Sequence, residues 1–436
     1  MSIFEKYYLD PNIVSVNEQP ARSYFIPYAD AVSASKLDRN RSPYFKTLCG
    51  EWNFRYYENV NELGEDFTTD EYFEDEFEST ETITVPRNWQ TVLSKGYDVP
   101  QYTNTNYPFP VDPPHIPDKN PCAVYTRDFY LSDGFAEKSV YLNFEGVDSC
   151  HYVWINGKFV GYSTVSHCTS EFDVSGAVKA GRNIIAVLVV KWNAQSYLED
   201  QDMFRFSGIF REVYLLARDK NHIRDIYVKQ SVSDDLGKAE LCLELDFVGK
   251  AKAEYTLLAP NNDIIAEGEY VKDKTVIEIQ NPVLWNDESP KLYKLIIYCG
   301  SEVIYQNIAV KQVKIVGKIF YINGKKVKIR GVNRHDSHPV LGHTAPYDHF
   351  VRDLKIFKQN NINSIRTSHY PNDPRMMELC DIYGFYMIDE ADLETHGMCV
   401  VNNWSGLSSD SLWEKAYVNR AKKLFERDKN RGCVIM

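Results

Sequence analysis

Histidine, arginine and carboxylate side chains gather at three points in the last third of the chain, each directly after an apolar run. The three points are residues 333–336 (NRHD), 366–369 (RTSH) and 389–396 (DEADLETH). Imidazoles and carboxylates can transfer protons and hold polar substrates, and guanidinium groups orient carboxylates. Any one of these side chains also has a structural interpretation, because a lone histidine is more often a hydrogen-bonded structural residue. Because such polar clusters follow three successive apolar runs, we favour an active site.

Glu394 and His396 have the residue types of a metal pair, a carboxylate oxygen and an imidazole nitrogen from one short segment. With two protein ligands, a water-rich Mg²⁺ site is the reading we favour, since Mg²⁺ retains several waters. A closed zinc site is less favoured because no Cys/His tetrad is present. An ordinary polar pair remains the alternative, and we expect nearby Cys380 and Cys399 to serve packing.

The elements that must position these residues alternate between strand and helix after about residue 317. Asn323-Gly324 predicts a hairpin. Apolar residues at 350, 354 and 357 predict an amphipathic helix. A second helix is predicted with Asp373 as N-cap, Pro374 in its first turn and Gly384 after its end. A third is expected over residues 411–427.

Continuous apolar strands joined by such helices predict a parallel sheet. Right-handed crossovers would curl it into a (β/α)₈ barrel or leave it as an open doubly wound sheet. In a barrel, catalysis occurs at the carboxyl ends of the strands, where the three polar clusters lie. The chain stops shortly afterwards, at an apolar run CVIM (433–436) that begins another strand.

The preceding residues are predicted to be β-rich. Residues 1–217 contain short β-branched and aromatic runs, and Asn156-Gly157 between two of them predicts a hairpin. The proline-rich loop 103–121, with Tyr107 and Phe109, is expected to be packed and functional, not a solvated connector. Residues 218–316 predict a second β unit, a spacer without chemistry of its own. Its strands are expected at 225–232, 239–247, 253–259, 275–279 and 293–299.

Length and composition limit the number of domains, the classes of binding partner and the cellular location. A chain of 436 residues predicts two to four domains, and a net charge of −12 argues against nucleic acids and anionic membranes. The sequence shows neither a signal peptide nor an apolar run of about 20 residues. Nine cysteines without CxxC spacing suit reduced thiols and a cytoplasmic location. Thirty tyrosines and seven tryptophans fit sugar binding and β-rich cores equally well.

The motifs also carry a resemblance. RGVNRHDSHP (330–339), IRTSHYPNDP (365–374) and IDEADLETHG (388–397) resemble the barrel motifs of glycoside hydrolase family 2, specifically its bacterial β-galactosidases. The upstream segments similar to that family are VPRNWQ (85–90), QYTNTNYPFPVDPPHIP (101–117), SYLEDQDMFRFSGIFREV (196–213) and VLWNDESPKLYKL (283–295). The likeness spans essentially the whole chain in the correct order.

The resemblance implies a jelly-roll sugar-binding domain (1–217), an immunoglobulin-like β-sandwich (218–316) and the first half of a (β/α)₈ TIM barrel (317–436). It implies roles for seven residues: Asn104 and Asp202 on the galactosyl unit, His335 and His369 on substrate hydroxyls, Arg366 steadying the nucleophile, and Glu394 and His396 on Mg²⁺, with Asp202 also a Na⁺ ligand. Phe204 stands where tryptophan is usual, which can soften the outer sugar subsite, and Asp336 where glutamate is frequent.

Retaining glycoside hydrolysis needs two carboxyl groups about 5–5.5 Å apart. In this family both catalytic glutamates follow the strand that CVIM begins, so we expect both beyond Met436 and assign neither role to Glu390 or Glu394. A (β/α)₈ barrel needs about 250 residues, and residues 317–436 supply less than half of that. We therefore expect a truncated barrel, from a gene-model error, an early stop or a split gene, whose independent folding is doubtful.

The leading hypothesis is a β-galactosidase fragment, inactive alone, whose complete form hydrolyses terminal β-D-galactosides such as lactose with retention. One alternative keeps the family but changes the sugar, giving a β-glucuronidase or β-mannosidase. Another is a non-catalytic carbohydrate-binding or complementing subunit that needs a C-terminal partner fragment. The resemblance also implies homo-oligomers for the complete form.

Overall fold

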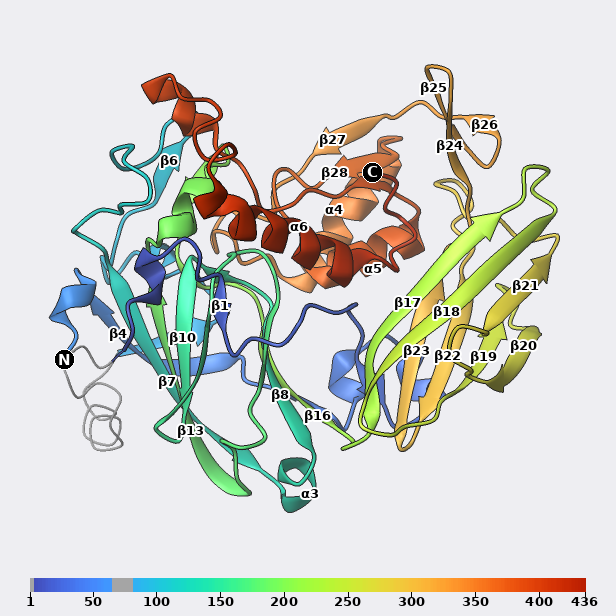
Figure 1. Ribbon diagram of the computed structural model, residues 1–436, viewed down its shortest axis with the longest axis horizontal. Helices are drawn as coiled ribbons and strands as arrows, with labels where there is room; N and C mark the ends of the chain where they lie inside the picture. Colours follow the sequence, from blue (N-terminus) through green and yellow to red (C-terminus); the bar gives the residue numbers. More distant parts are fainter. Residues whose placement is uncertain (1–3, 65–80) are drawn as a thin grey trace.

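The computed structural model describes residues 4–64 and 81–436. Two β-sandwiches stand side by side, and an α/β unit lies above and between them (Figure 1). The elements follow the chain in that order, first sandwich, second sandwich, α/β unit, so the predicted fold class is confirmed.

The first sandwich consists of a larger and a smaller antiparallel sheet. The larger has the order β1 (Ser15–Val16), β11 (Lys158–Ser163), β10 (Cys150–Ile155), β13 (Gly181–Val190), β7 (Cys122–Leu131), β4 (Gly50–Tyr57) and β5 (Glu81–Val85). The smaller has the order β12 (Ser170–Asp173), β8 (Ser139–Phe144), β16 (Val213–Arg218) and β3 (Phe45–Thr47). Alternate residues of both sheets meet in one core that includes Trp52, Val187 and Leu215.

Two short antiparallel ribbons accompany the sheets of the first sandwich. They are β6 (Gln101–Thr103) with β14 (Met203–Arg205) and β9 (Val147–Asp148) with β15 (Gly208–Ile209). The predicted hairpin at Asn156-Gly157 joins β10 to β11, with φ of 50° and 74° at its two residues. The proline-rich loop is packed as predicted, because Tyr107 and Phe109 are buried and the Tyr107 hydroxyl donates to the carbonyl of Tyr197.

Short helical segments occupy several of the loops that connect the strands. They are α1 (Ala31–Ala34), α3 (Asp133–Ala136), η1 (Tyr7–Leu9), η2 (Arg39–Arg41), η3 (Val60–Glu62), η4 (Trp89–Thr91), η5 (Ala194–Leu198), η6 (His396–Val401) and η7 (Ser411–Trp413).

The second sandwich has sheets of three and five strands. One is β17 (His222–Val232), β18 (Lys238–Val248) and β21 (Val276–Gln280); the other is β2 (Pro27–Tyr28), β23 (Glu302–Ile308), β22 (Tyr293–Cys299), β19 (Glu254–Leu258) and β20 (Ile264–Glu269). All five predicted strands are present. One strand crosses the boundary expected at residue 217, because β2 pairs with β23 and Phe25 enters the second core.

The α/β unit begins with the ribbon β24 (Val313–Val316), β25 (Ile319–Ile322) and β26 (Lys325–Lys326), which contains the predicted turn at Asn323-Gly324. Strands β27 (Gly331–Asn333), β28 (Ser364–Arg366) and β29 (Tyr386–Ile388) then pair in parallel. Helices α4 (Tyr347–Gln359), α5 (Pro374–Tyr383) and α6 (Glu414–Asp428) are the three predicted ones, with residues 411–413 forming η7 instead of the first turn of α6.

Both predicted ends of α5 are confirmed. The Asp373 side chain accepts from the Arg375 amide, and Gly384 ends the helix with a φ of 78°. The last residues of the chain continue the parallel sheet, because Val434 bridges Met387 and the Asp389 amide donates to the carbonyl of Met436 at 2.9 Å. The barrel therefore starts with β27, β28, β29 and the run at 433–436.

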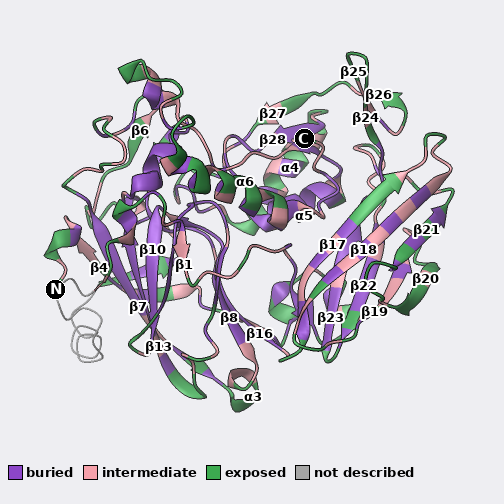
Figure 2. Ribbon diagram, in the orientation of Figure 1, coloured by how far each residue is buried: buried purple, intermediate pink, exposed green. Residues whose placement is uncertain are grey.

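Burial is concentrated in the inner faces of the sandwiches and beneath α4 and α5 (Figure 2). Four of the tryptophans, Trp52, Trp89, Trp285 and Trp413, are fully buried, so much of the aromatic content serves cores. All nine cysteines are free thiols, and Cys380 is buried, as packing residues are. Within residues 4–64 and 81–436, no helix has the length and apolar character that a membrane crossing requires.

Candidate active site

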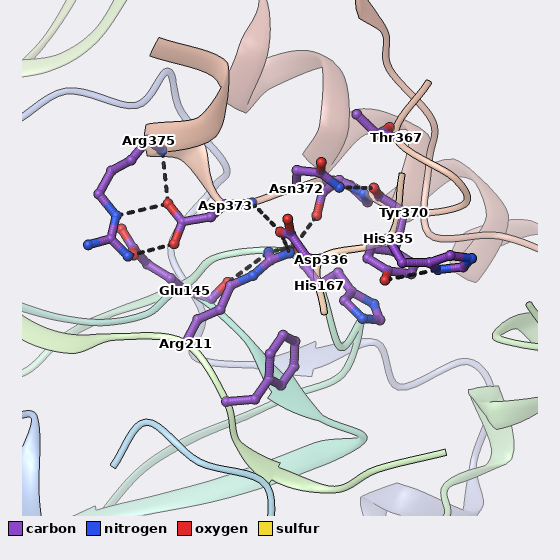
Figure 3. Close-up of polar contacts among 12 residues, drawn as sticks. Glu145, His167, Arg211, His335, Asp336, Thr367, Tyr370, Asn372, Asp373 and Arg375 are labelled. Carbon is purple, nitrogen blue, oxygen red and sulfur yellow. Dashed lines mark hydrogen bonds and ion pairs between the residues drawn. The ribbon is translucent and has the colours of Figure 1, made fainter. Parts of the chain in front are cut away.

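A buried ionic network joins the first sandwich to the polar ends of the barrel strands (Figure 3). Arg211, between β15 and β16, donates to Asp336 at 2.9 Å and to the carbonyls of Pro371 and His167 at 2.9 and 2.8 Å. Asp336 also pairs with Arg334 and accepts the amide of Asp373. These contacts hold the pKa of Asp336 below its usual range despite burial. Asp336 therefore fixes the loops after β27 and β28 and does not face a substrate.

Arg366, the last residue of β28, and His369, in the loop that follows it, meet on one carboxylate. The Arg366 Nε pairs with one oxygen of Glu390, and His369 Nδ1 lies 2.8 Å from the other. The Glu390 amide in turn donates to Thr367 Oγ1 at 2.9 Å. Glu390 thus connects the end of β29 to the end of β28. Because both of its oxygens are engaged, it is a positioning residue and not a free nucleophile.

His335, after β27, lies beside His369 with ring centroids 6.1 Å apart. Its Nδ1 is 3.2 Å from the hydroxyl of Tyr370. Burial and the neighbouring His369 lower the pKa of His335, so its imidazole is neutral near pH 7. A neutral imidazole offers one donor and one acceptor, which suits a sugar hydroxyl.

Asp202 belongs to the first sandwich and lines the same cavity as His335. It directly precedes β14, and its Oδ1 accepts the Tyr102 hydroxyl of β6 at 2.5 Å. The ladder pairs Thr103 with Met203, so continuing it by one residue sets Asn104 opposite Asp202. Asn104 is exposed. The two predicted galactose contacts from the first domain therefore occupy adjacent chains of one ribbon.

Backbone bonds attach the segment before Asp202 to the predicted metal segment. The Glu394 amide donates to the carbonyl of Leu198 at 2.8 Å, and the Asp200 amide donates to the carbonyl of Glu394 at 3.1 Å. Asp200 also accepts the Gly397 amide at 2.5 Å and pairs with Arg205 at 3.2 Å. Burial raises the pKa of Asp200 to about 6 even though Arg205 opposes the shift.

Glu394 and His396 lie close enough to share an ion. The Glu394 Oε1 is 3.8 Å from His396 Nδ1, a gap that an ion bound at about 2.1 Å to each can bridge. Burial raises the pKa of Glu394, and His369, His396 and Arg205 oppose this. A half-buried carboxylate of this kind gains from a cation. In the part of the chain that the structure describes, no three His, Cys, Asp or Glu side chains are grouped to hold a metal by themselves, so the donor set fits a water-rich Mg²⁺ ion.

A cavity of about 810 Å³ includes two of the predicted site residues in its lining, and the other five, Asn104, Arg366, His369, Glu394 and His396, are not part of that lining. Asp202, at its edge from the first sandwich, and His335, from the end of β27, both line it. Phe204 is half exposed in its wall and packs against Tyr102 with ring centroids 5.5 Å apart. The cavity is large enough for a sugar with a substituent, and its walls combine aromatic faces with a few polar groups.

Family models match almost the whole chain in the order of its three units. Residues 45–219 match the sugar binding domain of glycosyl hydrolases family 2, residues 221–334 match the central glycosyl hydrolases family 2 domain, and residues 313–436 match the family 2 TIM barrel domain. The chain belongs to glycoside hydrolase family 2. The resemblance stated from the motifs is confirmed.

Two curated relatives are β-galactosidases. The chain is 42% identical to that of Actinobacillus pleuropneumoniae over 462 aligned residues, covering all of this chain and 45% of the relative, and 40% identical to that of Staphylococcus xylosus, covering 99% and 43%. The chain thus spans less than half the length of these relatives. It aligns with the family 2 β-galactosidases and holds the first strands of their barrel.

Solved structures share the fold. The β-glucuronidase of Ruminococcus gnavus superimposes with a TM-score of 0.73 at 21% identity, over 90% of this chain and 66% of that one. A β-glucuronidase from an uncultured Clostridium species gives 0.72 at 26% identity, over 90% and 66%. At these identities the likeness describes the architecture that family 2 enzymes share.

Sequence reasoning missed several residues that organise the site. His167 and Asp392 form a fully buried pair at 3.1 Å, and Tyr370 stacks on His167. His167 lies in a segment without any motif, so no sequence signal was available. Tyr370 and Asp392 lie inside the quoted motifs, where their sequence positions near His369 and Glu394 were the only hint.

Proposed function

We propose that this chain supplies the substrate-positioning part of a β-galactosidase active site. The observation that carries the proposal is that Asp202, from the first sandwich, and His335, from the end of a barrel strand, line one cavity. The β-galactosidase relatives at 42% and 40% identity support galactose as the sugar. Carboxylate and imidazole groups that converge from two domains are suited to recognising several hydroxyls of one terminal sugar.

Each predicted residue has a role in this proposal. Asn104 and Asp202 bind the galactosyl unit from the β6–β14 ribbon, and His335 and His369 contact its ring hydroxyls. Arg366, held by Glu390, orients the nucleophile. Glu394 and His396 hold Mg²⁺, which when bound supplies positive charge close to the reacting sugar. Asp202 is also the proposed Na⁺ ligand.

We do not propose that this chain catalyses hydrolysis by itself. Retention requires a nucleophile and an acid/base about 5–5.5 Å apart, and we assign those roles to neither Glu390, whose oxygens are both paired, nor Glu394, which is reserved for the metal. The complete enzyme would hydrolyse terminal β-D-galactosides with retention. It would be a homo-oligomer, and residues 1–436 would need a complementing C-terminal fragment. Free thiols throughout support a reducing, cytoplasmic setting.

The test uses residues 1–436 in two assays. Calorimetry with isopropyl β-D-thiogalactoside and its glucose epimer should show binding of the galactoside only, and binding should disappear in Asp202→Asn. An o-nitrophenyl β-galactoside with Mg²⁺ should show no turnover. Selective binding of the glucose epimer or of an aryl β-glucuronide would show that the substrate sugar is not galactose. Robust turnover would refute the predicted inactivity.

A further inference from the structure

Tyr370 contacts two histidines from different domains. Its hydroxyl is 3.2 Å from Nδ1 of His335, and its ring stacks on His167 with centroids 3.8 Å apart and an interplanar angle of 15° (Figure 3). Tyr370 is completely buried. It therefore has a rigid position between the first sandwich and the substrate face of the barrel.

His167 is itself held firmly. Its ring Nδ1 and its backbone amide both contact Asp392 Oδ2, at 3.1 and 3.0 Å, and Arg211 donates to its carbonyl at 2.8 Å. Asp392 also accepts Gln201 Nε2 at 2.9 Å. The face on which Tyr370 stacks is therefore fixed from both the sandwich and the barrel.

The direction of the hydrogen bond between Tyr370 and His335 follows from what each group can do. Burial raises the pKa of Tyr370, so its oxygen keeps its proton, and the backbone of Asp336 already hydrogen-bonds that oxygen. The hydroxyl proton then needs an acceptor, and among the described residues His335 Nδ1 is the side-chain nitrogen that lies at hydrogen-bond distance, 3.2 Å. A buried hydroxyl that lost this acceptor would carry a desolvation penalty.

We propose that Tyr370 fixes the tautomer of His335: the phenol O–H donates a hydrogen bond to Nδ1, which leaves the imidazole N–H at Nε2. Tyr370 is a positioning residue in this scheme, and His167 holds it in place. His335 then presents a hydrogen-bond donor to the cavity. That consequence for a sugar hydroxyl rests on the proposed function, whereas the tautomer itself does not.

The tautomer can be measured without any ligand. Residues 1–436 labelled with ¹⁵N-histidine give long-range ¹H–¹⁵N correlations that separate a protonated ring nitrogen from an unprotonated one, and His335→Gln assigns the signals. We expect unprotonated Nδ1 and protonated Nε2 at pH 7. Tyr370→Phe keeps the ring that stacks on His167 and should shift Nδ1 of His335 toward a mixture of tautomers.

Tyr44→Phe is the matched control, because it removes another hydroxyl, one that donates to Ser301 at 2.6 Å outside the site. The His335 signals should not change in this variant. A protonated Nδ1 in the wild-type chain, or unchanged His335 signals in Tyr370→Phe, would overturn the proposal. Thiogalactoside affinity should fall roughly tenfold or less in Tyr370→Phe. If the chain binds no galactoside at all, only the proposed function fails, and the ¹⁵N result stands.

Discussion

Arg211 of the first sandwich and Asp336 of the barrel form a buried ion pair at 2.9 Å, with side chains 3% and 1% exposed. The same guanidinium reaches the carbonyls of His167 and Pro371. The pair therefore joins the first sandwich to the loops that carry His335 and His369. Because the pair is buried, we expect a substitution at either residue to lower stability and to alter the geometry of the site.

Arg211→Met should destabilise the chain by about 3 kcal/mol or more, because it leaves a buried carboxylate with one partner fewer. Urea unfolding at pH 7 measures this loss. Arg211→Met with Asp336→Asn should lose less than the sum of the two single changes, since the uncompensated charge is then absent. Lys229→Met, which breaks an exposed pair with Glu244, should change stability little. Equal effects of the Arg211 and Lys229 variants would contradict the assigned role.

Glu390→Gln should weaken thiogalactoside binding by about 1 kcal/mol, because it removes the charge that holds Arg366 and His369 together. The groups are partly exposed, so we expect no larger effect. Calorimetry at fixed salt measures it. Glu278→Gln removes a carboxylate that pairs with Lys238 on the second sandwich and should leave affinity unchanged. Undiminished affinity in Glu390→Gln would exclude a positioning role.

Glu394→Gln and His396→Asn should each weaken Mg²⁺ binding by at least about tenfold, because each removes one of the two proposed protein ligands. Isothermal titration with MgCl₂ alone provides the readout and requires no substrate. Glu244→Gln, on the exposed face of the second sandwich, is the control. Wild-type affinity in both site variants would place the metal elsewhere.

Acid should destabilise the first sandwich through His151. Burial lowers the pKa of His151 to about 3, whereas an unfolded histidine titrates near 6.5. Between these values the unfolded chain binds a proton that the folded chain does not, so the free energy of unfolding falls as the pH falls. His151 should account for roughly 2 kcal/mol of the loss between pH 7 and pH 5.

Urea unfolding at both pH values tests this with two variants. His151→Gln should lose less stability than the wild type on acidification. His115→Gln, which alters an exposed histidine, should follow the wild type. An identical pH dependence in all three proteins would show that His151 does not carry the effect.

Local sequence patterns predicted many of the elements and their order. The turns at Asn156-Gly157 and Asn323-Gly324 depend on residues that tolerate positive φ, and both are present. The α5 ends follow from Asp373, Pro374 and Gly384. Strand β20 was missed because it is an exposed edge strand whose residues do not alternate. Strand β2 was missed because its partner lies in the other sandwich.

The sequence by itself determined the family, the parallel strands and the polar clusters that follow them, because these depend on neighbouring residues and on short motifs. Only the tertiary structure decided how the clusters are used. It placed Asp336 in an ionic network, both oxygens of Glu390 on Arg366 and His369, and Tyr370 between His167 and His335. His167 and Tyr370 are separated by about two hundred positions, and a contact of that range leaves no periodicity or spacing in the chain, since it exists only when two domains pack.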